Sequence, residues 1–221
     1  MASFATTPRN RVVRVPDRGH YDRETVYAVI DEALICHVAF VQEGQPFVIP
    51  TLHARDGDRL LLHGATTSRL IRHVAAGHEV SVAMTLVDGL VLARSVFHHS
   101  VNYRSVVIFG RGGMVEDGEK MAALERFTEK LIPGRWSDAR RPNAVELKAT
   151  AVVAVPIDLA SAKIRTGGPK DDAEDYALPI WAGVVPMETR YLAPETDPAM
   201  TNDAPVPDYV TELLTVRNGQ T

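Results

Sequence analysis

Three hydroxyl side chains and a guanidinium are consecutive in the sequence at the point where a predicted strand ends and a predicted helix begins. Thr66, Thr67 and Ser68 directly precede Arg69, and apolar residues at helical spacing follow. Because the first turn of a helix has free backbone N–H groups, these residues offer several donors and a cation to one phosphate. The alternative is ordinary helix capping by Thr66 or Thr67, with Arg69 in solvent. The pattern therefore indicates a candidate phosphate-binding turn.

A predicted hairpin with two histidines precedes this turn. With the hairpin centred on Gly57, Thr51 faces His63 and His53 faces Leu61. Because side chains alternate along a strand, these four residues then share one face. His63 directly precedes the phosphate turn, and two hypotheses stay open for it. It packs against the ligand or hydrogen-bonds its phosphate, or it is a catalytic residue that donates a proton near its unperturbed pKa of about 6.5.

Three further places can contact a ligand. His98 and His99 point to opposite faces of a strand, so they are not expected to share a metal ion, and no metal site is predicted. Arg104 and Ser105 begin a long strand, where they either reach an anion or lie exposed at an edge. Trp136 follows an arginine in a loop and either anchors packing or stacks on a planar ligand.

Apolar spacing predicts the elements that must position these residues. Helices are expected over residues 22–33, 66–76 and 119–131. Strands are expected over residues 34–41, 47–55, 59–63, 79–87, 103–115, 150–157 and 161–165. Hairpins link most of these strands, and the strand–helix alternation of a doubly wound sheet is absent. We therefore expect a mainly β fold with helical decorations, in which a six-stranded antiparallel split β-barrel closes on itself.

The composition excludes several classes of protein. The 221 residues are 45% apolar and 24% charged, an ordinary globular mixture, and the formal net charge of −4 argues against nucleic acid as a partner. No apolar run reaches the roughly 18 residues of a membrane helix, and residues 1–18 lack the apolar stretch of a secretory signal. A cytoplasmic protein without membrane contact is expected. The single cysteine, Cys36, is expected to be an inert core thiol.

The chain divides into three predicted segments. Residues 1–20 form an extended basic arm, and residues 21–168 contain the predicted strands and helices. Residues 169–221 are acidic and rich in proline. Such a composition favours an irregular tail that wraps the surface or a partner, with a disordered end.

Several stretches together resemble a known family. They are HGATTSR at 63–69, NYRSVVIFGR at 102–111, PGRW at 133–136, and KIRTGGP at 163–169 followed by YALPIWAG at 176–183. This set resembles the FMN-binding split-barrel family related to pyridoxamine 5'-phosphate oxidase. Within that family it is most similar to the branch of nitroimidazole reductases and flavin-nucleotide-binding proteins. The resemblance covers about residues 22–186.

The resemblance implies a homodimer with FMN at its interface. Ser68 and Arg69 match the positions that grip the flavin phosphate, and His63 matches a flavin-adjacent histidine of the nitroimidazole reductases. Trp136 is expected to reach the flavin of the partner subunit. The residues predicted to bind the cofactor, from their pattern and from the resemblance, are Val48, Ile49, Pro50, Thr51, His63, Gly64, Thr67, Ser68, Arg69, Arg104, Ser105 and Trp136.

The chain also departs from the oxidase pattern. Leu70 stands where the oxidase has a second phosphate-binding cation, a lysine. The oxidase's C-terminal Arg-x-His, which binds the substrate phosphate, has no counterpart in this sequence. The oxidation of pyridoxamine 5'-phosphate is therefore not the expected reaction.

The leading hypothesis is an FMN-dependent oxidoreductase that passes electrons from a reduced nicotinamide to a small acceptor. Because the flavin itself carries the redox chemistry, no catalytic nucleophile or acid–base pair is needed. Two alternatives stay open. One is a non-catalytic flavin-binding or storage protein, and the other is a split-barrel relative that holds a deazaflavin or a haem. The absorbance spectrum of the purified protein separates these cofactors.

Overall fold

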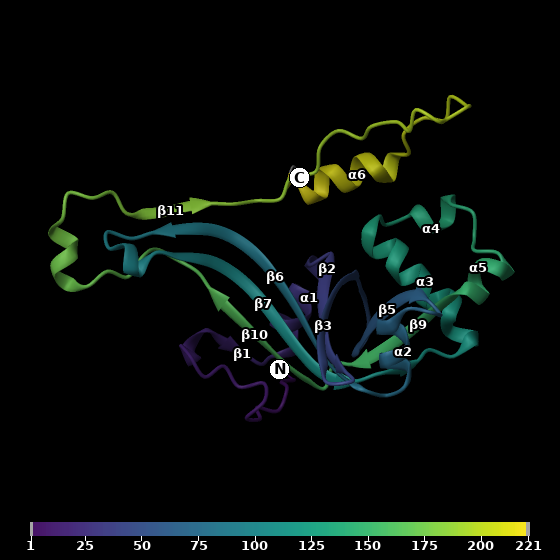
Figure 1. Cartoon of the computed structure of the whole chain (residues 1–221). Coiled ribbons are helices and arrows are strands. Elements are labelled where there is room, and N and C mark those ends of the chain that lie inside the picture. The colour runs from purple at the N-terminus through teal and green to yellow at the C-terminus, as the bar shows by residue number, and fades with distance from the viewer. Residues whose placement is uncertain (1, 220–221) are drawn as a thin grey trace.

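The computed structural model describes residues 2–219, which form helices, strands and an extended C-terminal segment (Figure 1). Its α-helices are α1 (Arg23–Glu32), α2 (Arg69–Ala75), α3 (Asp117–Leu131), α4 (Arg135–Asp138), α5 (Ala144–Ala149) and α6 (Asp208–Arg217). Single 3-10 turns are η1 (Pro16–Arg18), η2 (Val96–His98) and η3 (Ala173–Ala177).

The larger of two antiparallel sheets has seven strands in the order β1-β10-β7-β6-β2-β3, with β11 also paired to β6. These strands are β1 (Gly19–His20), β2 (Ile35–Gln42), β3 (Gln45–Leu52), β6 (Glu79–Leu92), β7 (Ser100–Arg111), β10 (Leu159–Arg165) and β11 (Gly183–Pro186). Because β3 ends this order, its outer backbone edge has no strand neighbour among residues 2–219. A backbone edge of this kind is open to hydrogen bonding.

The smaller sheet has four strands in the order β4-β5-β9-β8. They are β4 (Ala54–Asp56), β5 (Arg59–Ala65), β8 (Gly113–Met114) and β9 (Thr150–Pro156). Helices α2, α3 and α5 pack against this sheet. The chain passes from β3 to β4 at His53, so neighbouring segments of one predicted strand belong to different sheets.

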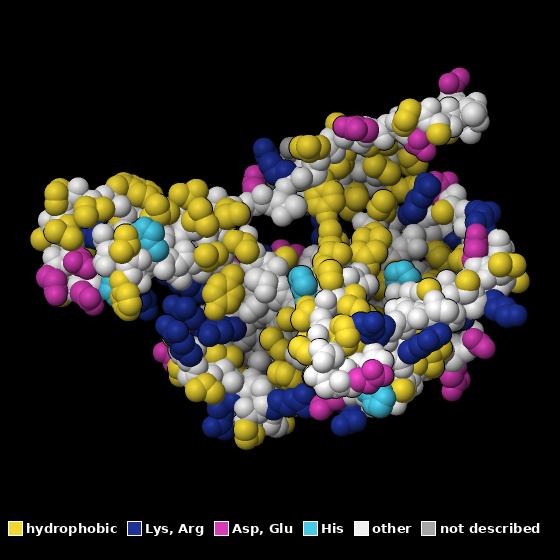
Figure 2. All heavy atoms as spheres, in the orientation of Figure 1, with side chains coloured by type: hydrophobic (Ala, Val, Ile, Leu, Met, Phe, Trp, Pro, Cys, Tyr) yellow, Lys and Arg dark blue, Asp and Glu magenta, His cyan; other side chains and the backbone are white. Residues whose placement is uncertain are grey.

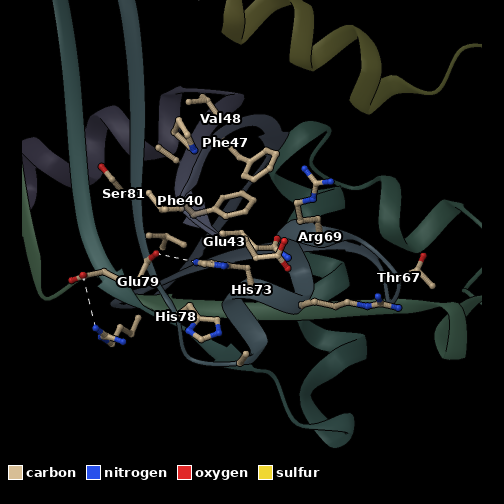
Figure 3. Close-up of a pocket in the computed structure, with 18 of the residues that line it drawn as sticks. Phe40, Glu43, Phe47, Val48, Thr67, Arg69, His73, His78, Glu79 and Ser81 are labelled. Carbon is tan, nitrogen blue, oxygen red and sulfur yellow. Dashed lines mark hydrogen bonds and ion pairs between the residues drawn. The ribbon is translucent and has the colours of Figure 1, made fainter.

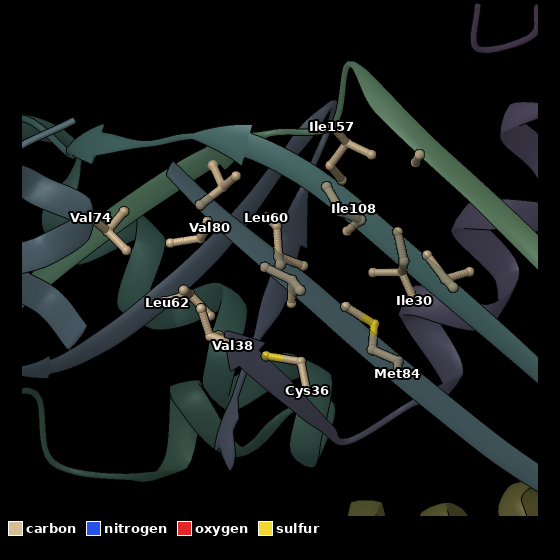
Figure 4. Close-up of a cluster of buried hydrophobic side chains, with 14 of the residues drawn as sticks. Ile30, Cys36, Val38, Leu60, Leu62, Val74, Val80, Met84, Ile108 and Ile157 are labelled. Atoms are coloured by element: carbon tan, nitrogen blue, oxygen red, sulfur yellow. The ribbon is translucent and has the colours of Figure 1, made fainter. Parts of the chain in front are cut away.

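Apolar side chains of both sheets and of α1 form the main core (Figure 4). Alternate residues of β2 and β6 point inward, as the pleat of a strand requires. Cys36 is fully buried in this core, and burial raises the pKa of its thiol to about 12, which confirms the predicted core cysteine. A second, smaller cluster joins Leu61 and Val152 to Phe127 of α3.

The β6–β7 hairpin continues beyond the core as a long arm (Figure 1). At the tip, Asp171 accepts hydrogen bonds from the backbone N–H groups of Arg94 (2.9 Å) and Ser95 (3.3 Å) and from the Arg94 guanidinium (3.0 Å). The chain then returns along the arm as β11, where Gly183 pairs with Leu92. We call β11 and the parts of β6 and β7 beside it the arm.

The C-terminal segment is more regular than the sequence suggested. It contains β11 and α6, whereas we expected an irregular tail. The unpaired edge of β6 supplies backbone partners for β11, and Tyr209 of α6 ties the helix to α4. Its hydroxyl donates to Asp138 (2.6 Å) and accepts from Arg135 (2.9 Å). Of the end expected to be disordered, residues 220–221 lie outside the described residues.

The prediction of a mainly β fold with helices between antiparallel strands is confirmed. The closed six-stranded barrel is not what forms. The strands lie in two separate sheets, and the pairing order of each sheet is open at both ends. β3 and β4 belong to different sheets on the two sides of His53, and β6 and β7 extend together beyond the core.

Two local predictions also need correction. The hairpin between β4 and β5 pairs Asp56 with Arg59 and Ala54 with Leu61, so the register is shifted by one residue. The turn holds two residues rather than three, with Gly57 at a positive φ of 59° as such turns favour. Thr51 pairs with Cys36 of β2 instead of facing His63. The second helix begins at Arg69, because residues 66–68 form a turn.

Candidate functional site

A large open cavity lies between the β2–β3 hairpin and α2 (Figure 3). We call it the arginine groove. Its volume is about 1140 Å³, at or above the range of typical small-ligand pockets. Residues that line it include Arg9, Phe40, Glu43, Phe47, Val48, Thr67, Arg69, Arg72, His73, His78, Glu79 and Arg111.

Aromatic rings in contact form the floor of the arginine groove. Phe40 and Phe47 stack with ring centres 5.4 Å apart, and Phe40 lies 4.5 Å from His73. His73 in turn lies 4.9 Å from the exposed ring of His78. On the open side, the Arg69 guanidinium covers the Phe47 ring at 4.2 Å (Figure 3). A floor of this kind suits a ligand that has both a planar ring and negative charge.

Two of the groove's arginines are not neutralised by acids. Arg9 and Arg111 both pair with Glu79, but Arg69 and Arg72 have no carboxylate partner among residues 2–219. Arg72 donates through Nε to the Thr66 carbonyl (3.3 Å), which leaves its two terminal nitrogens available. The Ser68 hydroxyl forms no capping bond to α2. Arg69 and Arg72 line the groove and are available to bind phosphate groups, whereas Ser68 borders Arg69 without being one of the lining residues.

A second, mostly apolar pocket of about 460 Å³ lies between β5, β3 and helices α3 and α4. We call it the His63 pocket. Its lining residues are Leu52, His63, Leu124, Phe127, Thr128, Leu131, Ile132, Arg135, Trp136, Pro142, Glu146 and Thr150. The volume and the mostly apolar lining fit an apolar ligand with a few polar groups.

His63 is the one histidine of this pocket, and its ring nitrogens bind no other group of the protein among residues 2–219. Nδ1 is buried without a hydrogen-bond partner. The ring packs edge-on against Phe127, with centres 4.4 Å apart. Burial lowers the pKa of His63, so the imidazole is neutral at pH 7. A neutral imidazole without a partner is suited to bind a metal centre and poorly suited to donate a proton.

Glu129 of α3 fixes the wall of the pocket that contains Trp136. Its carboxylate accepts hydrogen bonds from the backbone N–H groups of Gly134 (2.7 Å) and Trp136 (2.9 Å). Gly134 adopts a positive φ of 88°, which glycine allows without strain, and so turns the chain into α4. The Arg141 guanidinium lies over the Trp136 ring, 4.3 Å from its centre. Trp136 is thus held at the pocket within its own chain.

The two cavities are neighbours along two stretches of chain. His63 lines the His63 pocket, and Thr67 and Arg69 line the arginine groove only a few residues later. On β3, Val48 borders the groove and Leu52 borders the pocket. Val48 and Leu52 are four positions apart on this strand, about 13 Å. The free edge of β3 therefore runs from one cavity to the other.

The structure brings some predicted site residues together and leaves others apart. Thr67, Arg69 and Val48 line the groove, and His63 and Trp136 line the pocket. Arg104 and Ser105 line neither cavity. Arg104 pairs with Glu32 and with Asp88 (2.8 Å), and the Ser105 hydroxyl donates to the Lys163 carbonyl (3.2 Å). Their contact with the cofactor stays a prediction.

Other residues predicted to bind the cofactor lie between the residues of the arginine groove and those of the His63 pocket. Ile49, Pro50 and Thr51 lie on β3 between Val48 and Leu52. Gly64 packs against α2 so closely that a Cβ there would lie 3.2 Å from Ile71. A glycine at this position lets the strand end beside the helix that bears Arg69.

Sequence reasoning missed the aromatic floor and Arg72. The hairpin register pairs Phe40 directly with Phe47, a signal that was present once the β2–β3 turn was placed at residues 43–44. Arg72 follows Arg69 by three residues, the spacing that puts two side chains on one helix face.

Sequence reasoning also missed a pair of titratable groups in contact, the buried His53 and the half-buried Lys130. Lys130 Nζ donates to the Ile30 carbonyl (3.0 Å) and lies 2.7 Å from His53 Nε2. Burial lowers the pKa of Lys130 to about 8, and burial together with the Lys130 charge lowers the pKa of His53 to about 4. Both groups are therefore poorly solvated in the folded protein.

At the arm tip, His98 lies with Asp172 and Asp175 rather than with His99. One possible ligand atom from each of the three lies within 4.8 Å of the others, and Asp172 is exposed. No helix among residues 2–219 is both long and apolar enough to cross a bilayer.

Comparison with known proteins identifies the family. The model of the pyridoxamine 5'-phosphate oxidase family matches residues 22–164, well over half of the chain. The chain therefore belongs to this family of flavin-binding proteins. A search of curated proteins found no match.

Solved structures agree with this assignment. The flavocytochrome Anf3 from Azotobacter vinelandii is 40% identical with a TM-score of 0.89, over 93% of this chain and 96% of its own. The FAD and haem binding protein from Mycobacterium smegmatis is 37% identical with a TM-score of 0.86, over 89% and 97%. A putative 5-nitroimidazole antibiotic resistance protein from Bacteroides thetaiotaomicron, at 21% identity and a TM-score of 0.55 over 65% and 84%, shares the fold.

Proposed function

We propose that this chain is a redox protein that binds a flavin in the arginine groove and a haem in the His63 pocket. It would pass electrons from a reduced nicotinamide to a small acceptor. The observation that carries the proposal is the pair of neighbouring cavities along β3, one basic with an aromatic floor and one apolar with a neutral histidine. Relatives that are 40% and 37% identical are described as a flavocytochrome and as an FAD and haem binding protein.

The flavin phosphate is proposed to bind Ser68 and Arg69, as the resemblance to the family implied. Arg69 lies over the Phe47 ring in the structure and has no acid to neutralise it among residues 2–219. We propose FAD as the flavin rather than the FMN expected from the sequence. The groove is large, its second unpaired cation Arg72 can take a second phosphate, and the relative from Mycobacterium smegmatis is named for FAD.

The haem is proposed to bind His63 through its iron. Haem proteins commonly hold iron through a neutral histidine surrounded by apolar side chains. His63 meets both conditions, because burial keeps it neutral and Phe127, Leu124 and Leu131 line the same pocket. Iron binding is a third role for His63, beside contact with the flavin and proton donation. The variant His63→Gln separates the three roles.

Each cavity supplies binding and electrostatics, and the cofactors supply the redox chemistry. A flavin held at Ser68 and Arg69 would supply two-electron chemistry with the nicotinamide, and a haem held at His63 would supply one-electron transfer toward the acceptor. Arg69 and Ser68 orient the flavin phosphate, and the free edge of β3 offers backbone donors and acceptors beside Val48. Trp136 and Phe127 line the His63 pocket, and Phe127 packs edge-on against the His63 ring.

We also propose that the protein is a homodimer, as the family resemblance implied. The arm exposes apolar side chains that one chain does not cover, visible along its length in Figure 2. They include Val87, Leu90, Phe97, Trp181 and Val185. An apolar surface of this extent on an antiparallel arm is typical of an interface between subunits.

Spectroscopy of the purified protein tests the proposal. A flavin–haem protein shows the visible flavin band together with an intense haem Soret band, and each is bleached or shifted when reduced nicotinamide is added under argon. Denaturation and chromatography of the released flavin distinguish FAD from FMN. Flavin that is bound but not reduced by the nicotinamide would instead support a storage protein. A protein that binds neither flavin nor haem would overturn the proposal.

A further inference from the structure

We infer that the part of the arginine groove lined by Arg72, His78 and Glu43 is a separate subsite for the adenylate half of the flavin. It would make the protein prefer FAD to FMN. The inference rests on the proposed flavin function and extends it, because the flavin-phosphate residues predicted from the sequence include none of these three.

The charge of the groove supports a second phosphate position. Arg69 and Arg72 are three residues apart on α2, so their side chains leave the same face of the helix. Two adjacent like charges without acid partners repel each other, and a pyrophosphate would relieve that repulsion. A flavin with one phosphate needs only one of them. Arg72 is exposed and lines the groove, so its terminal nitrogens are accessible.

The edge of the aromatic floor provides a surface on which the adenine ring of FAD can stack. His78 is exposed, and its ring lies 4.9 Å from that of His73. The His73 ring is buried and packs against the Phe40 ring. The His73 ring is also held by the Glu79 carbonyl at 3.2 Å from Nε2. His78 therefore lies beside a fixed ring and lines the groove. Purine rings stack well on such a surface.

Glu43 supplies acceptors for ribose hydroxyls. It lies in the β2–β3 turn with φ at 51°, a left-handed conformation that few non-glycine residues adopt. Figure 3 shows its side chain within the groove, between Phe40 and Arg69. No ion pair with Glu43 is found among residues 2–219. In dinucleotide sites a carboxylate commonly accepts hydrogen bonds from the ribose.

Flavin binding to Arg72→Ala and His78→Ala tests the subsite directly. The protein is stripped of cofactor, and the affinities for FAD and FMN are measured separately by fluorescence titration. The wild type should bind FAD more tightly than FMN. Each variant should lose about 10-fold or more in FAD affinity, as expected for a charged hydrogen bond or a stacked base, and less than about 2-fold in FMN affinity. FMN binding also reports that the variant is folded.

Arg14→Ala is the matched control, because Arg14 is an exposed arginine that lines neither cavity. It should leave the ratio of the two affinities unchanged. Equal losses of FAD and FMN affinity in Arg72→Ala would place Arg72 at the flavin phosphate itself and overturn the separate subsite. Variants that keep the wild-type ratio of FAD affinity to FMN affinity would also overturn it. A wild type that binds both flavins equally would overturn it too, with flavin binding still intact. A wild type that binds neither would instead refute the proposed flavin function.

Discussion

The guanidinium of Arg69 lies 4.2 Å from the centre of the Phe47 ring and covers the face of that ring toward the groove. Phe40 stacks on the other face. Arg69 therefore has an aromatic partner but no carboxylate partner among residues 2–219. A guanidinium placed in this way is kept close to the groove and remains able to turn toward a phosphate, because the contact with the ring is worth only about 0.5–1 kcal/mol at an exposed site.

Arg69→Ala should therefore weaken flavin binding. The loss of a charged, bidentate contact costs about 1.5–3 kcal/mol, or about 10- to 100-fold in affinity. The variant should purify with less flavin per chain, and titration with flavin should give the weaker affinity. Arg14→Ala removes the same charge elsewhere and should purify with full flavin content. Stoichiometric flavin of unchanged affinity in Arg69→Ala would place the phosphate site elsewhere.

His63→Gln separates three roles for this histidine. If His63 binds the haem iron, the variant should lose haem by at least about 10-fold while it keeps its flavin, since glutamine does not replace imidazole as an iron ligand. The Soret absorbance per flavin measures this loss. His99→Gln, at the exposed arm tip, should keep the haem.

The other two hypotheses for His63 predict different results. If it packs against the flavin or hydrogen-bonds its phosphate, the variant should lose flavin affinity while the rate per bound flavin stays the same between pH 5 and 8. If it donates a proton, both cofactors should stay and the rate should fall about 100-fold, as for the loss of a general acid. The neutral state that burial imposes on His63 favours iron binding over proton donation.

Val87→Asp tests the proposed dimer. Val87 is exposed on the apolar surface of the arm, and a carboxylate there would have to be desolvated in the interface. Sedimentation at micromolar concentration should show a dimer for the wild type and mainly the 24.2 kDa chain for the variant. Val13→Asp, on the N-terminal segment, should remain dimeric. A wild type that sediments only as the single chain would contradict the dimer.

Local sequence patterns predicted the bounds of the helices better than the pairing of the strands. Asp22 caps α1 through a hydrogen bond to the Thr25 backbone (2.8 Å), and the boundaries of α1 and α3 lie within about two residues of those expected. These features depend on side chains close in sequence, so spacing reveals them. The break at His53 does not have such a signal, and the partners of the His53 ring, the Ile30 carbonyl and Lys130, are distant in sequence.

The same distinction holds for the candidate site. The cluster of Ser68 and Arg69 was predicted because its residues are contiguous. The aromatic floor needs α2 to pack beside the β2–β3 hairpin, which places His73 against Phe40. Likewise β11 and α6 pair with distant elements, so their composition alone suggested an irregular tail.

The buried pair of His53 and Lys130 makes the stability of the fold depend on pH. Burial, with the nearby Lys130 charge, lowers the pKa of His53 from 6.5 to about 4. Between these values the unfolded chain binds a proton that the folded protein does not, so the free energy of unfolding falls as the pH drops from 6.5 to 4. His53 is only 1% exposed, and the full pKa difference corresponds to about 3 kcal/mol.

Urea unfolding between pH 7 and 4 measures this effect. The wild type should lose stability steadily below pH 6.5, and His53→Gln, which keeps an amide near the Ile30 carbonyl but does not titrate, should lose less over the same range. His99→Gln replaces an exposed histidine at the arm tip and should keep the wild-type slope. If His53→Gln were less stable at every pH yet showed the wild-type slope, the acid sensitivity would belong to other groups, because the slope reports only protons taken up on unfolding.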